Sequence, residues 1–178
     1  GGTRNWGYDG VEWFAVQDSY GGPKGLKKLV DAAHNKGIAV ILDVVYNHFG
    51  PEGNYNGSFG PYTTAGHTDW GDVVNLSGPG SDEVRAYILD AVRQWLDEFH
   101  LDGLRLDAVH AYDDRRAFSI MEEIRRVSDS VAEATGVPRT IIGETDQNDP
   151  RIVNDESVGG YGLSAQWLDD VHHCVHTL

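Results

Sequence analysis

Two charged residues interrupt an apolar segment in the middle of the sequence, and their spacing could support acid–base chemistry. Arg105 and Asp107 stand two positions apart within residues 101–109, which are otherwise mostly apolar. A short run of this kind directly after a helical pattern predicts a buried strand, in which residues i and i+2 project to the same face. Because charges without partners are costly to bury, the two side chains either form a structural ion pair or line a polar pocket at the strand's end.

Two further apolar segments end in polar residues of the same kind. Residues 38–45 are apolar apart from Asp43, and Asn47 and His48 follow them directly. A third short segment further along the chain ends in Glu144. Because the carboxyl ends of parallel strands meet at one rim, these side chains are expected to converge with those of the central strand.

A pair of carboxylates on neighbouring strands suggests one class of reaction. Asp107 and Glu144 would lie on consecutive strands and could approach each other within about 5–6 Å, the separation typical of a retaining glycoside hydrolase. One carboxylate would attack the anomeric carbon, and the other, protonated, would give a proton to the leaving oxygen. Arg105 would keep Asp107 ionised, whereas Glu144 has no obvious cationic neighbour in the sequence, which suits a carboxyl kept protonated.

The pattern around these segments predicts alternating helices and strands. Helices are expected over residues 23–36, from Ser81 to His100, from Asp113 or Asp114 to Gly136, and over residues 169–176. Strands are expected over residues 38–45, 101–109, 139–144 and 163–167, with a short extended piece over residues 11–16 and long loops over residues 49–80 and 145–160. This order gives a doubly wound sheet or a (β/α)8 barrel, and polar strand ends without a glycine-rich phosphate-binding fingerprint favour the barrel.

The composition narrows the class of protein and of partner. The 178 residues are 40% hydrophobic and carry a formal charge of −14, which fits a globular domain and argues against nucleic acid or an anionic membrane surface as a partner. No apolar run reaches the roughly 18 residues of a membrane-spanning helix. Cys174 is the only cysteine and no signal peptide is visible, so a cytoplasmic location is expected. Because the chain begins at Gly1 rather than at Met, it is expected to be a piece of a longer protein.

Three motifs together resemble conserved regions of the alpha-amylase superfamily, in the same order and with suitable spacing. They are residues 43–48 (DVVYNH), 103–110 (GLRLDAVH) and 143–144 (GE). The resemblance implies that Asp107 is the nucleophile and that Glu144 is the general acid/base. It further implies a set of substrate-binding residues, consisting of Tyr8, Asp43, Asn47, His48, Arg105 and His110.

Three further sequence segments resemble particular groups within the superfamily. Residues 5–11 occur in the group of branching enzymes and trehalohydrolases, and residues 143–151 and 159–173 look specifically like the trehalohydrolases. This implies hydrolysis of the α-1,4 bond next to the terminal trehalose of maltooligosyltrehalose. The fold implied is α/β, with residues 1–178 forming a partial catalytic domain truncated at both ends, roughly strands three to six of a (β/α)8 barrel. The family's third catalytic Asp would lie beyond Leu178, and the chain alone is expected to be marginally stable and inactive.

Other interpretations of the same residues stay open. A 1,4-alpha-glucan branching enzyme is one alternative, and a non-catalytic carbohydrate-binding relative is another. Asn47 matches a position that binds calcium in many secreted amylases, but too few further ligands stand out, so neither a metal nor a cofactor is expected. The cluster of His172, His173, Cys174 and His176 has no distant partner pair and is not expected to bind metal. Trp70 and Trp95 are assigned to packing. A maltooligosaccharide or maltooligosyltrehalose is the expected partner, and the sequence gives no oligomeric state.

Overall fold

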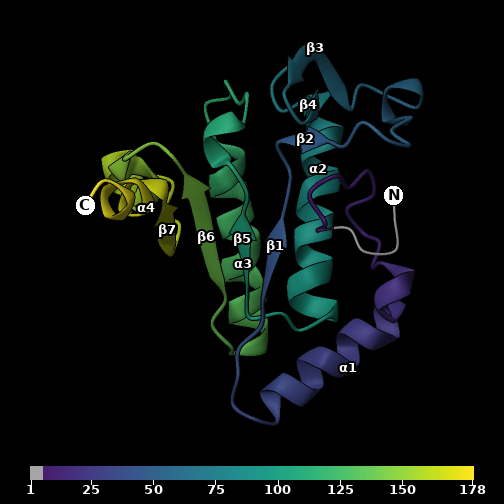
Figure 1. The fold of residues 1–178 in the computed structure, drawn as a ribbon, viewed down its shortest axis with the longest axis vertical. Coiled ribbons are helices and arrows are strands. Elements are labelled where there is room, and N and C mark those ends of the chain that lie inside the picture. The colour runs from purple at the N-terminus through teal and green to yellow at the C-terminus, as the bar shows by residue number, and fades with distance from the viewer. Residues whose placement is uncertain (1–5) are drawn as a thin grey trace.

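A parallel sheet forms the centre of the molecule, in a computed structural model that describes residues 6–178 (Figure 1). Its strands are β1 (Ile41–Val44), β5 (Gly103–Leu106), β6 (Thr140–Thr145) and β7 (Ala165–Leu168), in the order β1-β5-β6-β7. All three pairings are parallel, so the carboxyl ends of the four strands lie at one rim. The predicted α/β fold with a parallel sheet is confirmed.

Four helices accompany the sheet. They are α1 (Gly22–His34), α2 (Ser81–Arg93), α3 (Ile120–Thr135) and α4 (Asp169–His176). In Figure 1, α3 lies behind β5, α2 stands beside β1, and α1 lies at the end opposite to the strands' carboxyl ends. None of the helices within residues 6–178 combines the length and the apolar character needed to cross a membrane.

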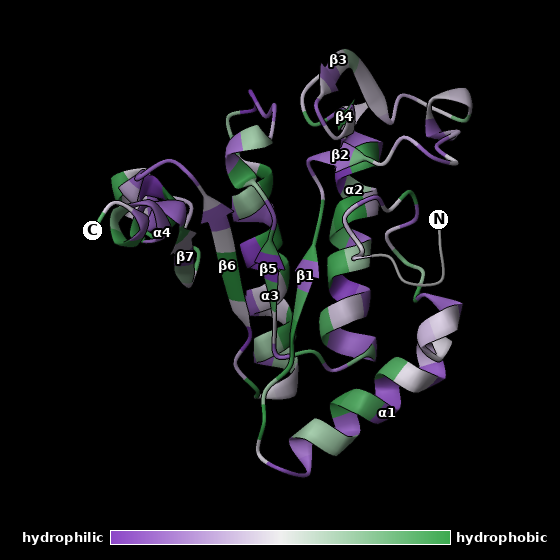
Figure 2. Cartoon of the chain, viewed as in Figure 1, coloured by the Kyte–Doolittle hydropathy of each residue, from purple (hydrophilic) through white to green (hydrophobic). Residues whose placement is uncertain are grey.

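The core fills the space between the sheet and its helices. Apolar positions recur along α2 and along the strands, where Figure 2 shows them in green. Leu104 and Leu106 of β5 and Ile88 of α2 are completely buried in one cluster with Ile124 of α3. Burying a side chain of this size contributes roughly 1.5–3 kcal/mol, so this layer holds β5, and therefore the residues at its end, in place.

The start of α3 differs from the sequence prediction. The helix begins after Ser119, whose side chain accepts a hydrogen bond from the helix while Glu122 reaches back to the Ser119 N–H, forming a capping box. Asp114 does not start the helix, because its Oδ2 accepts hydrogen bonds from Arg85 Nη1 (2.9 Å) and from the Ile120 N–H (2.6 Å). The predicted end at Gly136, in a left-handed conformation, is confirmed.

The start of α2 also differs from the prediction. Gly80, not Ser81, precedes the helix as its cap. Ser81 is buried inside the first turn, and its hydroxyl accepts a hydrogen bond from Arg116 Nη1 at 3.2 Å. The regular helix ends at Arg93, and a single π-helical turn, Gln94–Glu98, continues it toward β5.

The segment predicted as a loop over residues 49–80 contains a second, antiparallel sheet. Its strands are β2 (His48–Phe49), β3 (Thr63–Thr68) and β4 (Gly71–Val74), in the order β2-β4-β3. These strands are too short and too rich in Gly and Thr to show an apolar period, which explains why the prediction missed them. The small sheet lies above the carboxyl ends of the central strands (Figure 1).

The N-terminal segment carries no strand where a short extended piece was predicted. Residues 11–16 are irregular, with a turn at residues 13–14, and the ring of Trp13 packs into the core at a centroid distance of 4.4 Å from that of Phe49. Asn5, which belongs to the motif of residues 5–11, lies outside the described residues.

Candidate active site

The guanidinium of Arg105 joins three carboxylates at the carboxyl end of the central sheet. Its Nη1 donates to Asp43 Oδ1 and to Asp107 Oδ1, both at 2.7 Å, and its Nη2 lies 3.4 Å from Glu144 Oε2. Burial opposes the charge on Arg105, but the hydrogen bonds and charges of Asp43 and Asp107 outweigh it and raise the pKa of the guanidinium. The ion pair and the pocket that the sequence left as alternatives therefore occur together.

Strand register brings these groups into contact. Asp43 of β1 stands opposite Arg105 of β5 in the parallel ladder, and Arg105 stands opposite Ile142 of β6. Asp107 follows β5 directly, with its N–H donating to the Val44 carbonyl at 2.9 Å. β1 thus presents Asp43 to this rim and β6 presents Glu144, while β5 presents Arg105 and, directly after its end, Asp107.

A sharp turn after β5 connects the two carboxylates predicted to be catalytic. Ala108 adopts a left-handed conformation with φ of 43°, which is rare for a residue with a side chain. In this conformation its N–H donates to Glu144 Oε2 at 2.7 Å. The turn that follows Asp107 therefore positions the side chain of Glu144.

Burial raises the pKa of the Glu144 carboxyl group. The side chain is 10% exposed, and this burial raises the pKa of the carboxyl group more strongly than the Ala108 N–H and the charge of Arg105 lower it. Glu144 has no obvious cationic neighbour in the sequence, but in the fold a guanidinium nitrogen of Arg105 on the adjacent strand lies 3.4 Å away. A protonated Glu144 is thus favoured by desolvation and not by the absence of positive charge.

Asparagine and tyrosine side chains support the charged cluster from its sides. The Asn47 amide donates to the Asp107 carbonyl at 3.0 Å and to Asp107 Oδ2 at 3.3 Å, and its oxygen contacts the Nδ1 of His48. Burial lowers the pKa of His48, which favours the neutral ring. Tyr8 donates its hydroxyl to Asp43 Oδ2 at 2.6 Å, and this hydrogen bond raises the pKa of the phenol.

A cavity of about 480 Å³ opens over the cluster. Six of the eight predicted site residues line it, namely Tyr8, His48, Arg105, Asp107, His110 and Glu144. The other two, Asp43 and Asn47, do not line the cavity and instead contact the residues that do. The structure therefore brings all eight residues together, with six at the surface of the cavity and two behind it.

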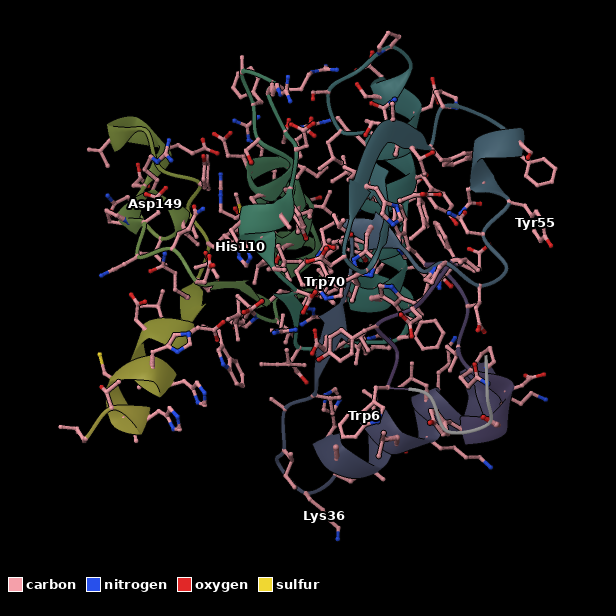
Figure 3. The ribbon with its side chains drawn as sticks, turned by 45° about the horizontal axis from the view of Figure 1, so that its top comes forward. Trp6, Lys36, Tyr55, Trp70, His110 and Asp149 are labelled. Carbon is pink, nitrogen blue, oxygen red and sulfur yellow. The ribbon has the colours of Figure 1, made fainter. Side chains whose placement is uncertain are left out.

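Sequence reasoning missed several residues of the cavity wall. Trp70, assigned to packing, is half-exposed on the turn between β3 and β4, and its ring centroid lies 6.1 Å from that of His48. Figure 3 shows Trp70 and His110 at the strands' carboxyl end. Asp146 Oδ1 lies 3.4 Å from His110 Nδ1, and Asp169 follows β7 on the same rim.

Some of these residues carry a sequence signal and one does not. Asp169 stands two positions after the predicted strand over residues 163–167, and Asp146 stands two positions after Glu144. The strand-end rule that found Asp107 could therefore also have found both. Trp70 lies on the hairpin of β3 and β4, whose sequence shows no apolar alternation that would predict strands. Within residues 6–178, no group of three or more His, Cys, Asp or Glu side chains is arranged to hold a metal ion.

The sequence is similar to a known family model and to known proteins. The family model described as the alpha amylase catalytic domain matches residues 2–71. The chain is 56% identical to the malto-oligosyltrehalose trehalohydrolase of Rhizobium sp. strain M-11, over 98% of the chain and 30% of that protein. It is 31% identical to the 1,4-alpha-glucan branching enzyme GlgB of Corynebacterium jeikeium, over 92% of the chain and 26% of that protein.

A solved structure shares the fold. A protein of Salmonella typhimurium, described as a candidate alpha amylase, superposes with a TM-score of 0.85 and 39% identity, over 99% of this chain and 30% of that one. The chain spans 26–30% of the length of these two curated relatives. The motifs, the family model over residues 2–71 and the fold therefore make the chain similar to proteins of the alpha-amylase superfamily.

Proposed function

We propose that residues 1–178 are the central part, roughly strands three to six, of the (β/α)8 catalytic domain of a retaining α-glucan hydrolase. The reaction is cleavage of the α-1,4 bond next to the terminal trehalose of maltooligosyltrehalose, with release of trehalose and a maltooligosaccharide. The observation that carries this proposal is the shared contact of Arg105 with Asp107 at 2.7 Å and with Glu144 at 3.4 Å. Two carboxylates on neighbouring strands, held by one cation, are the pair that double-displacement chemistry requires.

Each carboxylate receives its role from its surroundings. Asp107 contacts Arg105 and the Asn47 amide, which hold the side chain and orient an oxygen for attack on the anomeric carbon. Glu144 is buried, with a raised pKa, and gives its proton to the leaving oxygen as the glycosidic bond breaks. In the second step Glu144 takes a proton from water, the water oxygen bonds to the anomeric carbon, and the bond to Asp107 breaks.

The walls of the cavity suit a neutral oligosaccharide. Tyr8 and Trp70 offer ring faces on which sugars stack, and His48 and His110 offer nitrogen atoms to hydroxyl groups. Besides Asp107, four acidic side chains line this cavity, namely Asp9, Glu144, Asp146 and Asp169. This acidic lining, like the formal charge of −14, disfavours an anionic ligand such as a nucleic acid.

A second candidate is a glucan branching enzyme, a transferase that uses the same two steps but passes the glycosyl group to a sugar hydroxyl. The 31% identity to the C. jeikeium branching enzyme favours this candidate. The 56% identity to the Rhizobium trehalohydrolase over nearly the whole chain favours hydrolysis more. A non-catalytic carbohydrate-binding protein is a third candidate, and the presence of both Asp107 and Glu144 argues against it.

One incubation separates the candidates. The longer protein that contains this chain is incubated with maltooligosyltrehalose and, separately, with amylose. Free trehalose from the first substrate supports the proposed hydrolase. New α-1,6 branches in amylose without trehalose release would establish the transferase instead, and binding of both sugars without any product would establish the non-catalytic protein.

A further inference from the structure

Trp167 stands in one row of the sheet with the two carboxylates proposed to be catalytic. In the parallel ladder, Trp167 of β7 is the partner of Glu144 of β6. The ladder of β5 and β6 pairs Leu106 with Gly143, so the next position places Asp107 beside Glu144. Residues that stand side by side in a parallel ladder project to the same face of the sheet. This face therefore carries Asp107, Glu144 and the indole of Trp167 in a row.

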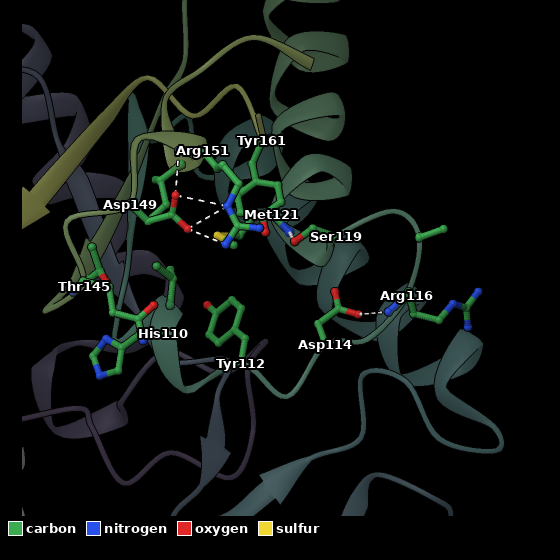
Figure 4. Close-up of a pocket in the computed structure, with 14 residues that line it drawn as sticks. His110, Tyr112, Asp114, Arg116, Ser119, Met121, Thr145, Asp149, Arg151 and Tyr161 are labelled. Atoms are coloured by element: carbon green, nitrogen blue, oxygen red, sulfur yellow. Dashed lines mark hydrogen bonds and ion pairs between the residues drawn. The ribbon is translucent and has the colours of Figure 1, made fainter. Parts of the chain in front are cut away.

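The sequence neighbours of Glu144 and Trp167 belong to the opposite face. Thr145, directly after Glu144, lines a separate pocket of about 270 Å³, which is shown in Figure 4. Gln166, directly before Trp167, donates its side-chain Nε2 to the carbonyl oxygen of Asp149, a residue that lines the same pocket. Successive side chains of a strand alternate between its two faces. Trp167 and Glu144 therefore project together toward the catalytic side of the sheet.

The indole of Trp167 also reaches Arg105, which lies two strands away. The centroid of the indole lies 6.0 Å from the guanidinium carbon, at the range of a cation–π contact. Ala165 and Arg105 are level across the sheet, because Ile142 of β6 pairs with both. The small side chain of Ala165 leaves room for the indole to lean across β6, the strand that carries Glu144. Because the side chain of Trp167 is still 60% exposed, the contact with Arg105 and not the hydrophobic core holds the ring.

The surroundings of Glu144 make an apolar neighbour important. Burial is the largest effect on the pKa of this carboxyl group and raises it, whereas the Ala108 N–H and the charge of Arg105 lower it. A large aromatic ring next to a carboxyl group excludes water and disfavours the charged form. The indole of Trp167 is such a ring, and it projects from the neighbouring strand at the level of Glu144.

We propose that Trp167 is a positioning residue for the general acid, whose indole shields the Glu144 carboxyl from water and keeps Arg105 in its place between the carboxylates. This inference rests on the proposed function. Shielded in this way, Glu144 keeps its proton until the leaving oxygen takes it as the glycosidic bond breaks. Trp167 acts through Glu144 and Arg105 and needs no contact with the reacting atoms. A role in packing alone would change the stability of the protein and leave the pH dependence of catalysis as it is.

The pH dependence of hydrolysis tests this role. Trp167→Ala is made in the longer protein, and kcat/KM for trehalose release from maltooligosyltrehalose is measured over a pH series. The alkaline limb of this profile reports the pKa of the group that must be protonated. Without the indole, water reaches Glu144 and its pKa falls, so the limb should move to lower pH by about one unit. Arg105, Asp107 and Asp169, the charged groups that act on Glu144, are the same in both proteins.

Two further variants separate shielding from a general loss of function. Trp167→Phe keeps an aromatic ring and should return the alkaline limb most of the way to its wild-type position. Trp70→Ala is the matched control, since it removes an indole that lines the same cavity next to His48 and not next to Glu144. Its KM should rise while its alkaline limb stays at the wild-type pH. An unmoved limb in folded Trp167→Ala, or an equal shift in Trp70→Ala, would overturn the inference.

A substitute variant and a structure keep the inference testable. If Trp167→Ala does not fold by circular dichroism, Trp167→Thr, whose branched side chain suits a strand, should give the same shift. A crystal structure of the longer protein should show the indole within about 6 Å of the Arg105 guanidinium, and a ring turned away from Arg105 would contradict the proposed role. Failure of the wild-type protein to release trehalose would instead overturn the proposed function.

Discussion

Arg105 is the positive charge that faces the three carboxyl groups of the site. One guanidinium faces Asp43, Asp107 and Glu144, and only two of these three carboxylates lie within 3 Å of it. With all three ionised, the cluster would carry an excess of negative charge in a partly buried site. The nearby charges of Asp169 and Asp107 act in the same direction as burial on Glu144 and raise its pKa. Burial and these charges therefore favour the protonated form of Glu144, which is the form a general acid needs.

Replacement of Asp107 tests the nucleophile directly. Asp107→Asn keeps the size of the side chain and its contact with Asn47, so the fold should stay intact. The amide cannot attack the anomeric carbon, and the rate of trehalose release by the longer protein should fall by about 10³-fold or more. Initial rates and a circular dichroism spectrum measure the two effects, and near-normal activity in a folded variant would exclude Asp107 as the nucleophile.

Replacement of Glu144 tests the pKa shift through stability. A carboxyl whose pKa is raised by folding contributes stability that is fully present below its unfolded pKa of about 4.3, and that is lost as pH rises through the folded pKa. Glu144→Gln cannot ionise, so its free energy of unfolding should fall less than that of the wild-type protein over this rise in pH. Urea unfolding at a series of pH values measures the difference, and a constant difference across the series would rule out a raised pKa.

The rule that polar residues follow parallel strands predicts most of the charged site. It identified Asp43, Asp107 and Glu144 because each lies in or directly after an apolar segment. The rule gives no information about backbone groups, so it could not predict that the Ala108 N–H binds Glu144. Nor could it place Trp70, since the hairpin that carries this residue is positioned by tertiary contacts and not by its own sequence pattern.

Among the elements, the pair of β5 and β6 controls the geometry between Arg105 and Glu144. At Gly103 the two strands approach so closely that an added Cβ would lie 2.2 Å from the Thr140 carbonyl oxygen. Gly103 is therefore required by the neighbouring strand and not by a turn. A side chain at this position would push β6 away and lengthen the contact between Arg105 and Glu144.

Substitution of Gly103 tests this close approach. Gly103→Ala in the longer protein should lower the free energy of unfolding by about 1–3 kcal/mol and reduce activity, because the strands must separate. Gly57→Ala is the matched control, since its added Cβ would meet only the Thr63 Oγ1 at 3.5 Å. Chemical denaturation and initial rates measure both variants, and equal effects at the two positions would contradict this account of β5 and β6.

The helices and strands were predicted where an apolar pattern dominates the segment. The start of a helix was missed where a polar side chain binds groups outside the helix. The apolar periods identified the four helices and the four parallel strands, and Gly136 gave the end of α3. The start of α3 was predicted too early, because the carboxylate of Asp114 serves the buried Arg85 and the Ile120 N–H from outside the helix. A sequence pattern shows that Asp114 is a good capping residue but not which groups it will bind in the fold.

At the scale of the whole molecule, the four-stranded sheet has two open edges. β1 pairs only with β5, and β7 only with β6, within residues 6–178. A cavity of about 550 Å³ beside β1 is lined largely by apolar side chains, among them Trp13, Leu26, Leu29, Leu42 and Val44. Open edges and exposed apolar surface both favour association with other chains. In a closed barrel, neighbouring strands would cover them.

This architecture predicts how residues 1–178 behave when produced alone. The chain should self-associate at micromolar concentration, because its open strand edges can pair with strands of other chains. It should also bind a hydrophobic dye through the apolar cavity beside β1. It should also release no trehalose, whereas the longer protein should be active and bind little dye. Sedimentation velocity and dye fluorescence measure the two proteins side by side. A monomeric, dye-free chain with the same unfolding midpoint as the longer protein would show that the four strands form a complete unit, and would contradict the proposed assignment to the centre of a larger barrel.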